Sequence, residues 1–371
     1  MASSEIIAVI QKYISNPLAA PVIGDKAIAG VIGDGPSHYS KSPNLWNAAF
    51  QRLGMDATYL PFDTDAAQVG ELLAVLKHSE RFLGVNVTVP HKVRVMDYVD
   101  ELDAGAKRIR AVNTIVRNAD GRLVGYNTDG EGFIESLLAR QPGHAGSFIG
   151  SLKGMDVLLL GAGGSARAVA FHAADLLDGG QLLICNRTFE HAASLAVDVN
   201  KSGGNARALL ESELSNYGVK VGMIVNSTTK GQGGVRKLGQ DKVTLLESYS
   251  ALAPANPPVF DESNLSNHDF DRKWSEAARP DVEANNQASW TLAKSIPPQV
   301  GFYDLIYHPE ESVFLRHGRL TGHPTMNGKA MIVNQAVIAF CKRICRAALQ
   351  AKGMDTPETR KEILEVMYRA W

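Results

Sequence analysis

A strand that runs directly into a glycine turn and then a helix is the feature of this chain that most restricts its fold. Residues 157–160 (VLLL) are a short apolar run, and GAGGSARAVA follows at once. Gly161, Gly163 and Gly164 let the backbone turn tightly and approach a pyrophosphate, whose charge meets the helix N-terminus. A second apolar run, QLLIC, ends at residue 185. This strand–helix–strand unit predicts a parallel sheet that binds a dinucleotide.

The preceding part of the chain also alternates strands with helices. Residues 27–33 (AIAGVIG), 57–63 (ATYLPFD) and 83–89 (LGVNVTV) have strand patterns with helical patterns between them, and a hairpin with its turn at residues 119–121 follows. Strands separated by helices indicate a largely parallel sheet. The chain has 371 residues, which is long enough for two domains. The expected fold class is therefore α/β, with two α/β domains.

The same patterns suggest where the domains lie. We expect an N-terminal domain at residues 26–130 and a Rossmann-type domain at residues 131–326. Residues 232–300 are rich in Pro, Asn, Asp and Ser, and they predict an irregular insertion or lid. Residues 1–25 predict an amphipathic helical extension that docks on the body or on a partner chain, and residues 327–371 predict further helices.

Composition and charge restrict the partners. The formal net charge is −1, which gives no electrostatic footprint for nucleic acid or anionic membrane, and no apolar run is long enough to span a bilayer. The N-terminus lacks the basic region of a signal peptide, and the three cysteines form no disulfide framework, so we expect a cytoplasmic protein. Cys341 and Cys345 lack further ligands nearby, so we expect core packing and no metal site. A monomer or homodimer is expected.

The end of the second strand indicates which dinucleotide binds. Asn186-Arg187-Thr188 follows that strand, without an Asp or Glu. An acidic residue there would hold the ribose hydroxyl of NAD and repel a 2′-phosphate, whereas Arg187 can pair with that phosphate. The alternative is an exposed arginine that only solubilises the surface. We expect NADP, with NAD as the alternative.

The strand pattern at residues 83–89 ends in polar groups. Its polar side chains, Asn86 and Thr88, share one face, and Pro90-His91-Lys92 follows. By itself, Lys92 is most simply interpreted as a solvated surface lysine. Other segments favour a functional role.

Ser40 and Ser42 lie two residues apart in SHYSKSPNLWN, so both hydroxyls face one way in an extended backbone. Pro43 then begins a helix, whose positive end lies beside them. Two hydroxyls and a helix N-terminus form a neutral cradle for a carboxylate. Ser42 alone can be explained as an N-cap, which leaves Ser40 without a role.

Two further segments supply polar groups. Asn113 lies among apolar residues of IRAVNTIV, where a buried amide needs partners. Asp129 opens the helix of GYNTDGEGFIESLL, although a capping box of Thr128 with Glu131 also explains this segment. Together the segments predict a site for a small polyhydroxylated acid, with Thr88, Asn113 and Asp129 at ring hydroxyls.

In such a site, Lys92 would donate a proton to a carbonyl that receives hydride. A nearby carboxylate keeps the ammonium protonated, whereas partial burial acts in the opposite direction. The sequence does not decide between these two effects on the lysine.

These segments together resemble the shikimate dehydrogenase family, whose signatures recur here in order and at similar spacing. The matching segments are Ser40-Lys41-Ser42-Pro43, Asn86–Lys92, Ala111–Thr114, Asn127–Gly130, the glycine turn, Asn186-Arg187-Thr188, and residues 226–228 (NST), 303–309 (YDLIYHP) and 327–336 (NGKAMIVNQA). The resemblance covers residues 27–230 and 300–345 in broad terms.

The resemblance implies NADP-linked, reversible reduction of 3-dehydroshikimate to shikimate in a cleft between a substrate-binding, catalytic N-terminal domain and the Rossmann-type domain. It implies that domain closure excludes water there, and that residues 327–371 complete the N-terminal domain. Lys92 and Asp129 are its implied catalytic pair. The implied substrate contacts are Ser40, Ser42, Thr88, Asn113, Tyr307 and Gln335, and Gly328 is implied to approach the nicotinamide.

Two positions depart from the family pattern. Tyr39 stands where His is usual, and His191 stands where a second Arg or Lys often follows Asn-Arg-Thr. One alternative is a quinate dehydrogenase, or an enzyme for an aminated ring, whose selectivity would lie near Ser40, Ser42 and Tyr39. Another is a non-catalytic metabolite-sensing regulator, which would be expected to have lost the catalytic Lys or Asp.

Overall fold

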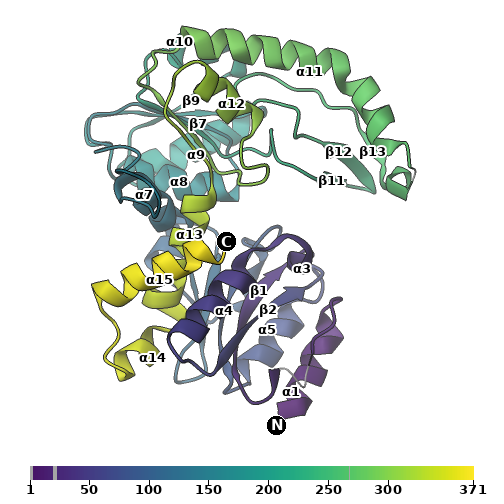
Figure 1. Ribbon diagram of the computed structural model, residues 1–371, viewed down its shortest axis with the longest axis vertical. Coiled ribbons are helices and arrows are strands. Elements are labelled where there is room, and N and C mark those ends of the chain that lie inside the picture. The colour runs from purple at the N-terminus through teal and green to yellow at the C-terminus, as the bar shows by residue number, and fades with distance from the viewer. Residues whose placement is uncertain (1–2, 20–22, 267) are drawn as a thin grey trace. The chain divides into compact units, whose positions relative to one another are not determined.

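The computed structural model describes residues 3–19, 23–266 and 268–371, and the chain forms two compact units (Figure 1). Unit 1 consists of Met1–Glu135, Gln141–His144 and Met331–Trp371, and unit 2 of Ser136–Arg140 and Ala145–Ala330.

A mixed six-stranded sheet forms the centre of unit 1. Its strands are β1 (Ala27–Gly33), β2 (Ala57–Asp63), β3 (Phe82–Val87), β4 (Glu101–Leu102), β5 (Thr114–Arg117) and β6 (Leu123–Tyr126). Their order across the sheet is β2-β1-β3-β5-β6-β4. The first three are parallel, and β5 and β6 form the predicted antiparallel hairpin. This edge-to-edge order places the carboxyl ends of β1 and β3 side by side.

Side chains of β1 alternate between two apolar layers, as expected of a strand covered on both faces. Ile28 and Ile32 belong to the core on one face, and Ala29 and Val31 to the core on the other. The first core contains α1 (Ser3–Ile10) and α5 (Val69–Lys77). The second contains α4 (Ser42–Arg52), α13 (Lys329–Ile338), the π-helical segment Ala339–Ile344, α14 (Arg346–Ala351) and α15 (Pro357–Arg369). The C-terminal helices therefore pack on the sheet of unit 1.

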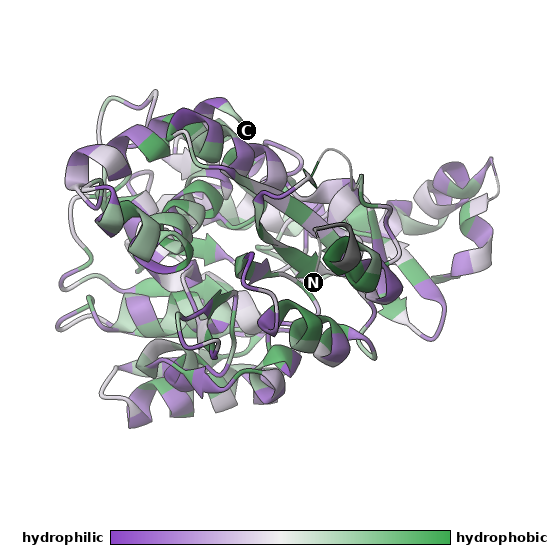
Figure 2. Cartoon of the chain, turned by 90° about the horizontal axis from the view of Figure 1, so that it is seen from below, coloured by the Kyte–Doolittle hydropathy of each residue, from purple (hydrophilic) through white to green (hydrophobic). Residues whose placement is uncertain are grey.

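Further helical segments connect these elements. They are the 3-10 segments Gln11–Tyr13 and Arg94–Tyr98, α3 (Pro36–Tyr39), α6 (Ala104–Ile109) and α7 (Asp129–Leu138). Figure 2 shows the strands in largely hydrophobic colours and the helices striped, which is the pattern of helices with one buried face.

Unit 2 is built on a fully parallel sheet. Its strands are β7 (Val157–Leu160), β8 (Leu182–Cys185), β9 (Ala206–Leu209), β10 (Met223–Asn226), β14 (Gly301–Asp304) and β15 (Thr325–Met326). They are ordered β15-β14-β10-β7-β8-β9, which is the doubly wound dinucleotide-binding order with β7 as its first strand. The helices around it are α8 (Gly164–Ala174), α9 (Phe189–Lys201), α10 (Leu214–Tyr217), α12 (Val313–Leu320) and the 3-10 segment Glu211–Glu213. The expected α/β, Rossmann-type fold class is confirmed.

The prediction of an irregular insertion at residues 232–300 is wrong for most of that segment. It contains an antiparallel sheet of β11 (Val235–Gly239), β12 (Lys242–Leu245) and β13 (Phe260–Asp261), the 3-10 segment Glu262–Ser266 and the long helix α11 (Phe270–Ser295), drawn in green in Figure 1. The polar composition hid a helical pattern, because Phe270, Trp274 and Ala278 recur every fourth residue and are buried. The prolines at 254, 257 and 258 lie in the connection between β12 and β13.

The three cysteines, Cys185, Cys341 and Cys345, are free and buried. Burial raises the pKa of Cys185 and of Cys341 to about 12, and it raises that of Cys345 as well. Across the described part of the chain, no three or more His, Cys, Asp or Glu side chains are grouped to hold a metal. No helix among the described residues has both the length and the apolarity to cross a membrane.

Candidate active site

Lys92 and Asp129 meet in unit 1. Lys92 follows β3 by five residues, and Asp129 is the first residue of α7. The Lys92 Nζ donates to Asp129 Oδ2 at 2.6 Å, and the two side chains are 16% and 6% exposed. An ion pair so little exposed is screened far less than a surface pair. The two residues form an ion pair that retains limited access to solvent.

Asn113 orients this pair from the opposite side. Its Nδ2 donates to Asp129 Oδ1 at 2.7 Å, so both carboxylate oxygens have a protein donor. The Asn113 Oδ1 accepts from the Thr128 backbone N–H at 2.8 Å. Since a carboxylate only accepts and an N–H only donates, these two contacts fix which way the Asn113 amide faces. The start of α7 is therefore tied to the residue before β5.

Gln335 on α13 reaches the same cluster. Its Oε1 accepts from the Thr128 hydroxyl at 3.2 Å and lies 3.4 Å from Asn113 Nδ2. Its Nε2 donates to the Ile332 carbonyl at 3.0 Å. Lys92, Asn113, Asp129 and Gln335, four of the residues proposed from sequence, are thus brought together.

A buried hydrogen-bond chain runs from this cluster towards the two serines. Asn113 Oδ1 accepts from Thr114, whose hydroxyl accepts from Asn86, and the Tyr59 hydroxyl donates to Asn86 Oδ1 at 2.7 Å. Burial raises the pKa of Tyr59, and a hydrogen bond with Ser42 opposes that rise. The chain therefore connects Asn113 to Ser42 through polar groups only.

Ser40 and Ser42 are adjacent, but their local roles differ from the N-cap interpretation. The Ser40 Oγ accepts from the Ser42 backbone N–H at 3.2 Å. The residue at the N-cap of α4 is Lys41, whose side chain makes no capping hydrogen bond, and Ser42 is already the first helical residue. The Ser42 hydroxyl is consequently directed to Tyr59 rather than to the helix terminus.

Thr128 and Glu131 do not form the capping box that was an alternative explanation for the start of α7. The Glu131 carboxylate accepts from Lys342 and from Arg343, each at 3.0 Å. The Thr128 hydroxyl faces Asn113 and Gln335 instead. Thr88, the residue directly after β3, lies against Gly33 at the end of β1, where a β-carbon on residue 33 would overlap the Thr88 methyl group.

The glycine turn of unit 2 has the geometry expected of a dinucleotide site. Gly161 has φ +110°, a conformation that side chains disfavour, and its N–H donates to the Cys185 carbonyl at 2.7 Å. Gly163 is at the N-cap of α8, and Gly164 is its first residue. No atom lies where a β-carbon on either would stand, which leaves room for a pyrophosphate at the helix N-terminus.

The three residues after β8 occupy the position of the ribose-binding loop. Asn186 Nδ2 donates to the Thr188 carbonyl at 2.9 Å, and Thr188 is the N-cap of α9. The Arg187 side chain is exposed. A guanidinium at this point suits a 2′-phosphate, so the residues present fit NADP.

Tyr307 and Gly328 belong to unit 2 and lie near the end of β14. Burial raises the pKa of Tyr307. The Gly328 N–H donates to the Ile306 carbonyl at 2.9 Å, and a β-carbon on Gly328 would overlap the Leu305 backbone. Tyr307 as a substrate contact and Gly328 as a nicotinamide contact stay predictions.

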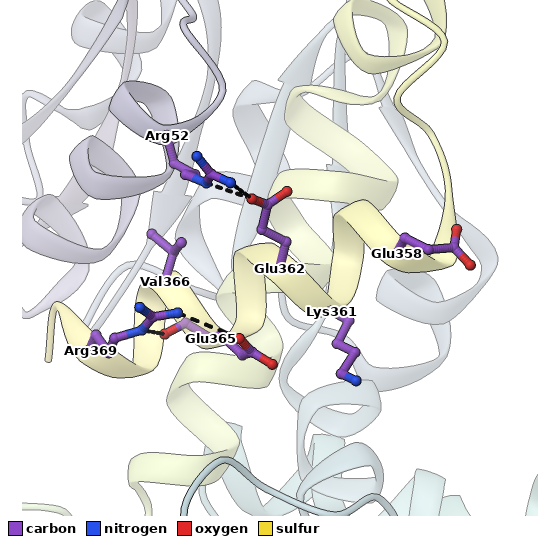
Figure 3. A pocket seen from close by; sticks show the side chains of 7 residues that line it. All are labelled: Arg52, Glu358, Lys361, Glu362, Glu365, Val366 and Arg369. Atoms are coloured by element: carbon purple, nitrogen blue, oxygen red, sulfur yellow. Dashed lines mark hydrogen bonds and ion pairs between the residues drawn. The ribbon is translucent and has the colours of Figure 1, made fainter.

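A groove of about 570 Å³ between α4 and α15 is separate from these residues (Figure 3). It is lined by Arg52, Glu358, Lys361, Glu362, Glu365, Val366 and Arg369. Arg52 pairs with Glu362, and Arg369 with Glu365, so the charges largely neutralise each other. None of the proposed site residues lines this groove.

Comparisons with known proteins bear on both units. Residues 31–115 match the model of the shikimate dehydrogenase substrate binding domain. An NADP⁺-type shikimate dehydrogenase of Desulforamulus reducens is 33% identical over 321 residues, covering 85% of this chain and 89% of the relative. One from Carboxydothermus hydrogenoformans is 34% identical over 319 residues, covering 86% and 92%. The shikimate 5-dehydrogenase of Thermus thermophilus, crystallised with NADP(H) and shikimate, is 25% identical, with a TM-score of 0.62 and coverage of 93% and 99%.

The doubly wound sheet with its glycine turn, together with the polar site of unit 1, defines a dinucleotide-binding α/β oxidoreductase. The relatives make the assignment more specific. This chain belongs to the shikimate dehydrogenase family.

Sequence reasoning missed several members of the hydrogen-bond chain. Asn86 and Thr128 were recognised as polar but not as site residues, and the alternation of β3 and the neighbouring Asp129 were the available signals. Thr114 directly follows Asn113, which was a weak signal. Tyr59 gave none, because a tyrosine in a strand is usually explained by packing.

Proposed function

We propose that this chain is an NADP-dependent shikimate dehydrogenase that reversibly reduces 3-dehydroshikimate to shikimate, with Lys92 and Asp129 as its proton-transfer pair. The observation that carries the proposal is the 2.6 Å contact between these two side chains, held by Asn113. The family membership of the chain supports the overall reaction, and the residues around the glycine turn suit NADP.

The residues of unit 1 divide the reaction between them. Bound NADPH supplies the hydride for the carbonyl carbon. The Lys92 ammonium donates a proton to the carbonyl oxygen in the reductive direction, and its neutral amine accepts the hydroxyl proton in the oxidative direction. Asp129 stabilises the ammonium and fixes its direction. Asn113 in turn holds Asp129, so that the pair is preorganised before substrate arrives.

The remaining groups recognise the substrate. Ser40 and Ser42 bind the carboxylate through their hydroxyls. Thr88, Asn113 and Gln335 meet the ring hydroxyls. Tyr307 is a further substrate contact in this proposal.

The first test is NADPH formation from shikimate by the wild type and by Lys92→Ala. Loss of the proton-transfer group is expected to reduce kcat about 10²–10⁴-fold, whereas KM for shikimate should change much less because the other contacts remain. Rates with quinate and with NAD, measured in parallel, test the substrate and cofactor assignments. A tenfold or greater preference for quinate would replace shikimate in the proposal.

Lys77→Ala is the matched control. Lys77 also makes a 2.6 Å ion pair, with Asp100, in the same unit. The Lys77→Ala variant should have the same kcat as the wild type. Wild-type turnover in Lys92→Ala would contradict the role given to Lys92.

A further inference from the structure

Asp304, the last residue of β14, is a fully buried carboxylate that the mechanism above does not use. Its Oδ1 accepts from the Ile306 N–H and from Asn226 Nδ2, each at 2.9 Å, and its Oδ2 accepts from the Ser312 hydroxyl at 2.5 Å. A carboxylate without partners would be strongly destabilising in such a position. Here one side chain joins the ends of two strands and the N-cap of α12.

Asp304 also decides how Asn226 is oriented. The Asn226 Nδ2 donates to Asp304 Oδ1, which accepts whether the carboxyl group is ionised or carries its proton on Oδ2, and the Asn226 Oδ1 is left to face Thr228. That oxygen accepts from the Thr228 backbone N–H at 2.9 Å and from the Thr228 hydroxyl at 2.7 Å. The loop after β10 is therefore fixed through Asp304.

This network lies along the carboxyl edge of the parallel sheet, where ligands of doubly wound folds bind. The Ser227 hydroxyl donates to the Leu160 carbonyl at 2.7 Å, which joins the loop after β10 to the glycine turn. On the other side, the Gly328 N–H donates to the Ile306 carbonyl. Asp304 is at the centre of a continuous set of contacts from β7 to the residues before α13.

The two halves of the sheet serve different parts of a dinucleotide. The glycine turn and Arg187 follow β7 and β8, so the pyrophosphate and the 2′-phosphorylated adenosine belong to the half formed by β7, β8 and β9. The other half, formed by β10, β14 and β15, is then left for the nicotinamide nucleotide. Asp304 and Asn226 end two of its three strands.

We propose that Asp304 is a positioning residue for the nicotinamide half of NADP, acting through Asn226, the Ile306 amide and Ser312 rather than by touching the cofactor. This inference rests on the proposed function only in taking NADP as the ligand. Complete burial raises the pKa of Asp304 to about 7, although its three hydrogen bonds lower it. The carboxyl group that holds these partners is therefore not ionised at every pH near neutrality. The arrangement requires an acceptor oxygen that faces Asn226 and Ile306 and a hydrogen-bond partner for the Ser312 hydroxyl, and a neutral amide can supply both.

The test compares Asp304→Ala with Asp304→Asn in the full-length protein, using equilibrium binding of two probes well below the melting temperature. The alanine leaves three donors without an acceptor and should weaken NADP binding about tenfold. It should leave binding of 2′,5′-ADP, which carries only the adenosine half, unchanged. The asparagine keeps an acceptor for Asn226 and Ile306 and a donor to Ser312, so it should bind NADP within about threefold of the wild type.

Ser289→Ala is the matched control, because Ser289 is a buried serine of unit 2 that binds Ser250 and His317. It should lower stability without changing affinity for either probe. If Asp304→Ala does not fold, Ser312→Ala removes a single donor and should weaken NADP binding about threefold. Equal losses for NADP and 2′,5′-ADP, or an asparagine variant as weak as the alanine variant, would overturn the proposal. A wild type that binds NADP but does not oxidise shikimate would refute the proposed function and leave this inference standing.

Discussion

Gly132 is a position in unit 1 where no side chain larger than the hydrogen atom of glycine fits. It lies in the first turn of α7, and a β-carbon there would stand 2.6 Å from the Gln335 backbone nitrogen and 2.7 Å from its β-carbon. The absence of a side chain lets α7 and α13 approach closely. That approach brings the Gln335 amide to Thr128 and Asn113.

Gly132→Ala should therefore destabilise unit 1 although alanine is the better helix former. Helix propensity favours alanine by about 1 kcal/mol, whereas overpacking against a helix backbone costs about 1–3 kcal/mol or more. The displaced Gln335 should also raise KM for shikimate. Urea unfolding and steady-state kinetics measure the two effects.

Gly105→Ala is the control for this prediction. Gly105 lies in α6 of the same unit, and the nearest atom to a β-carbon there is 3.5 Å away. It should be neutral or slightly stabilising. A Gly132→Ala variant that behaves like Gly105→Ala would show that α13 can move without loss.

At this scale the sequence indicated candidate polar residues for the site but not what orients them. Lys92, Asn113 and Asp129 could be proposed because buried or strand-terminal polar groups need partners. The partner of Glu131 could not, because Lys342 and Arg343 are more than 200 positions away and a local capping box explained the same residue.

At the scale of elements, α11 is the clearest departure from expectation. Asn285 is one attachment of this helix to unit 2, a buried side chain whose Oδ1 accepts from the Ser250 N–H and whose Nδ2 faces three carbonyls, those of Ser250, Ala253 and Pro254. Trp274 packs at the other end of the helix, beside β12. The content of proline and asparagine suggested an irregular segment. The helix forms because its buried residues, which include Phe270, Trp274 and Ala278, recur on one face.

Asn285→Ala should destabilise unit 2 by about 2–3 kcal/mol, because it leaves one buried N–H and several buried carbonyls without partners. Gln287→Ala, at an exposed position two residues further along the same helix, should change stability by less than about 0.5 kcal/mol. The midpoints of urea unfolding compare the two. Equal midpoints would contradict a stabilising role for Asn285.

At the scale of the whole molecule, Asp304 predicts an unusual pH dependence of stability. Its pKa is raised to about 7 by burial, from an ordinary value of 3.8. The folded state therefore binds more protons than the unfolded state between these values, and the stability from this group is present below about pH 4 and lost as pH rises through about 7. The difference is on the order of 4 kcal/mol at most, since one pKa unit corresponds to about 1.4 kcal/mol.

The measurement is the melting temperature of the wild type minus that of Asp304→Asn, followed from pH 5 to pH 8. This difference should decrease as pH rises. The subtraction is necessary because the pKa values of Asp100, Asp269 and Glu311 are lowered by their lysine and arginine partners, and those contributions are lost as pH falls. A difference that does not vary with pH would show that Asp304 is ionised throughout.

Much of the two-unit architecture could be predicted because local patterns specify it. The glycine turn, the strand–helix alternation and the hairpin at residues 119–121 each depend on neighbours in sequence. The order of strands within each sheet, and the packing of α13 and α15 on unit 1, depend on contacts between distant residues. The family resemblance predicted that the C-terminal helices complete the N-terminal domain, and the physical patterns alone did not.

The buried thiols have a practical consequence. All three native cysteines are buried, and their thiols stay protonated at neutral pH. Maleimide dyes should therefore not react with the folded wild type. A single cysteine introduced at an exposed position such as Val89, three residues before Lys92, would then be the thiol that reacts with the dye. The protein is in this sense ready for site-specific fluorescent labelling without first replacing any of its own residues.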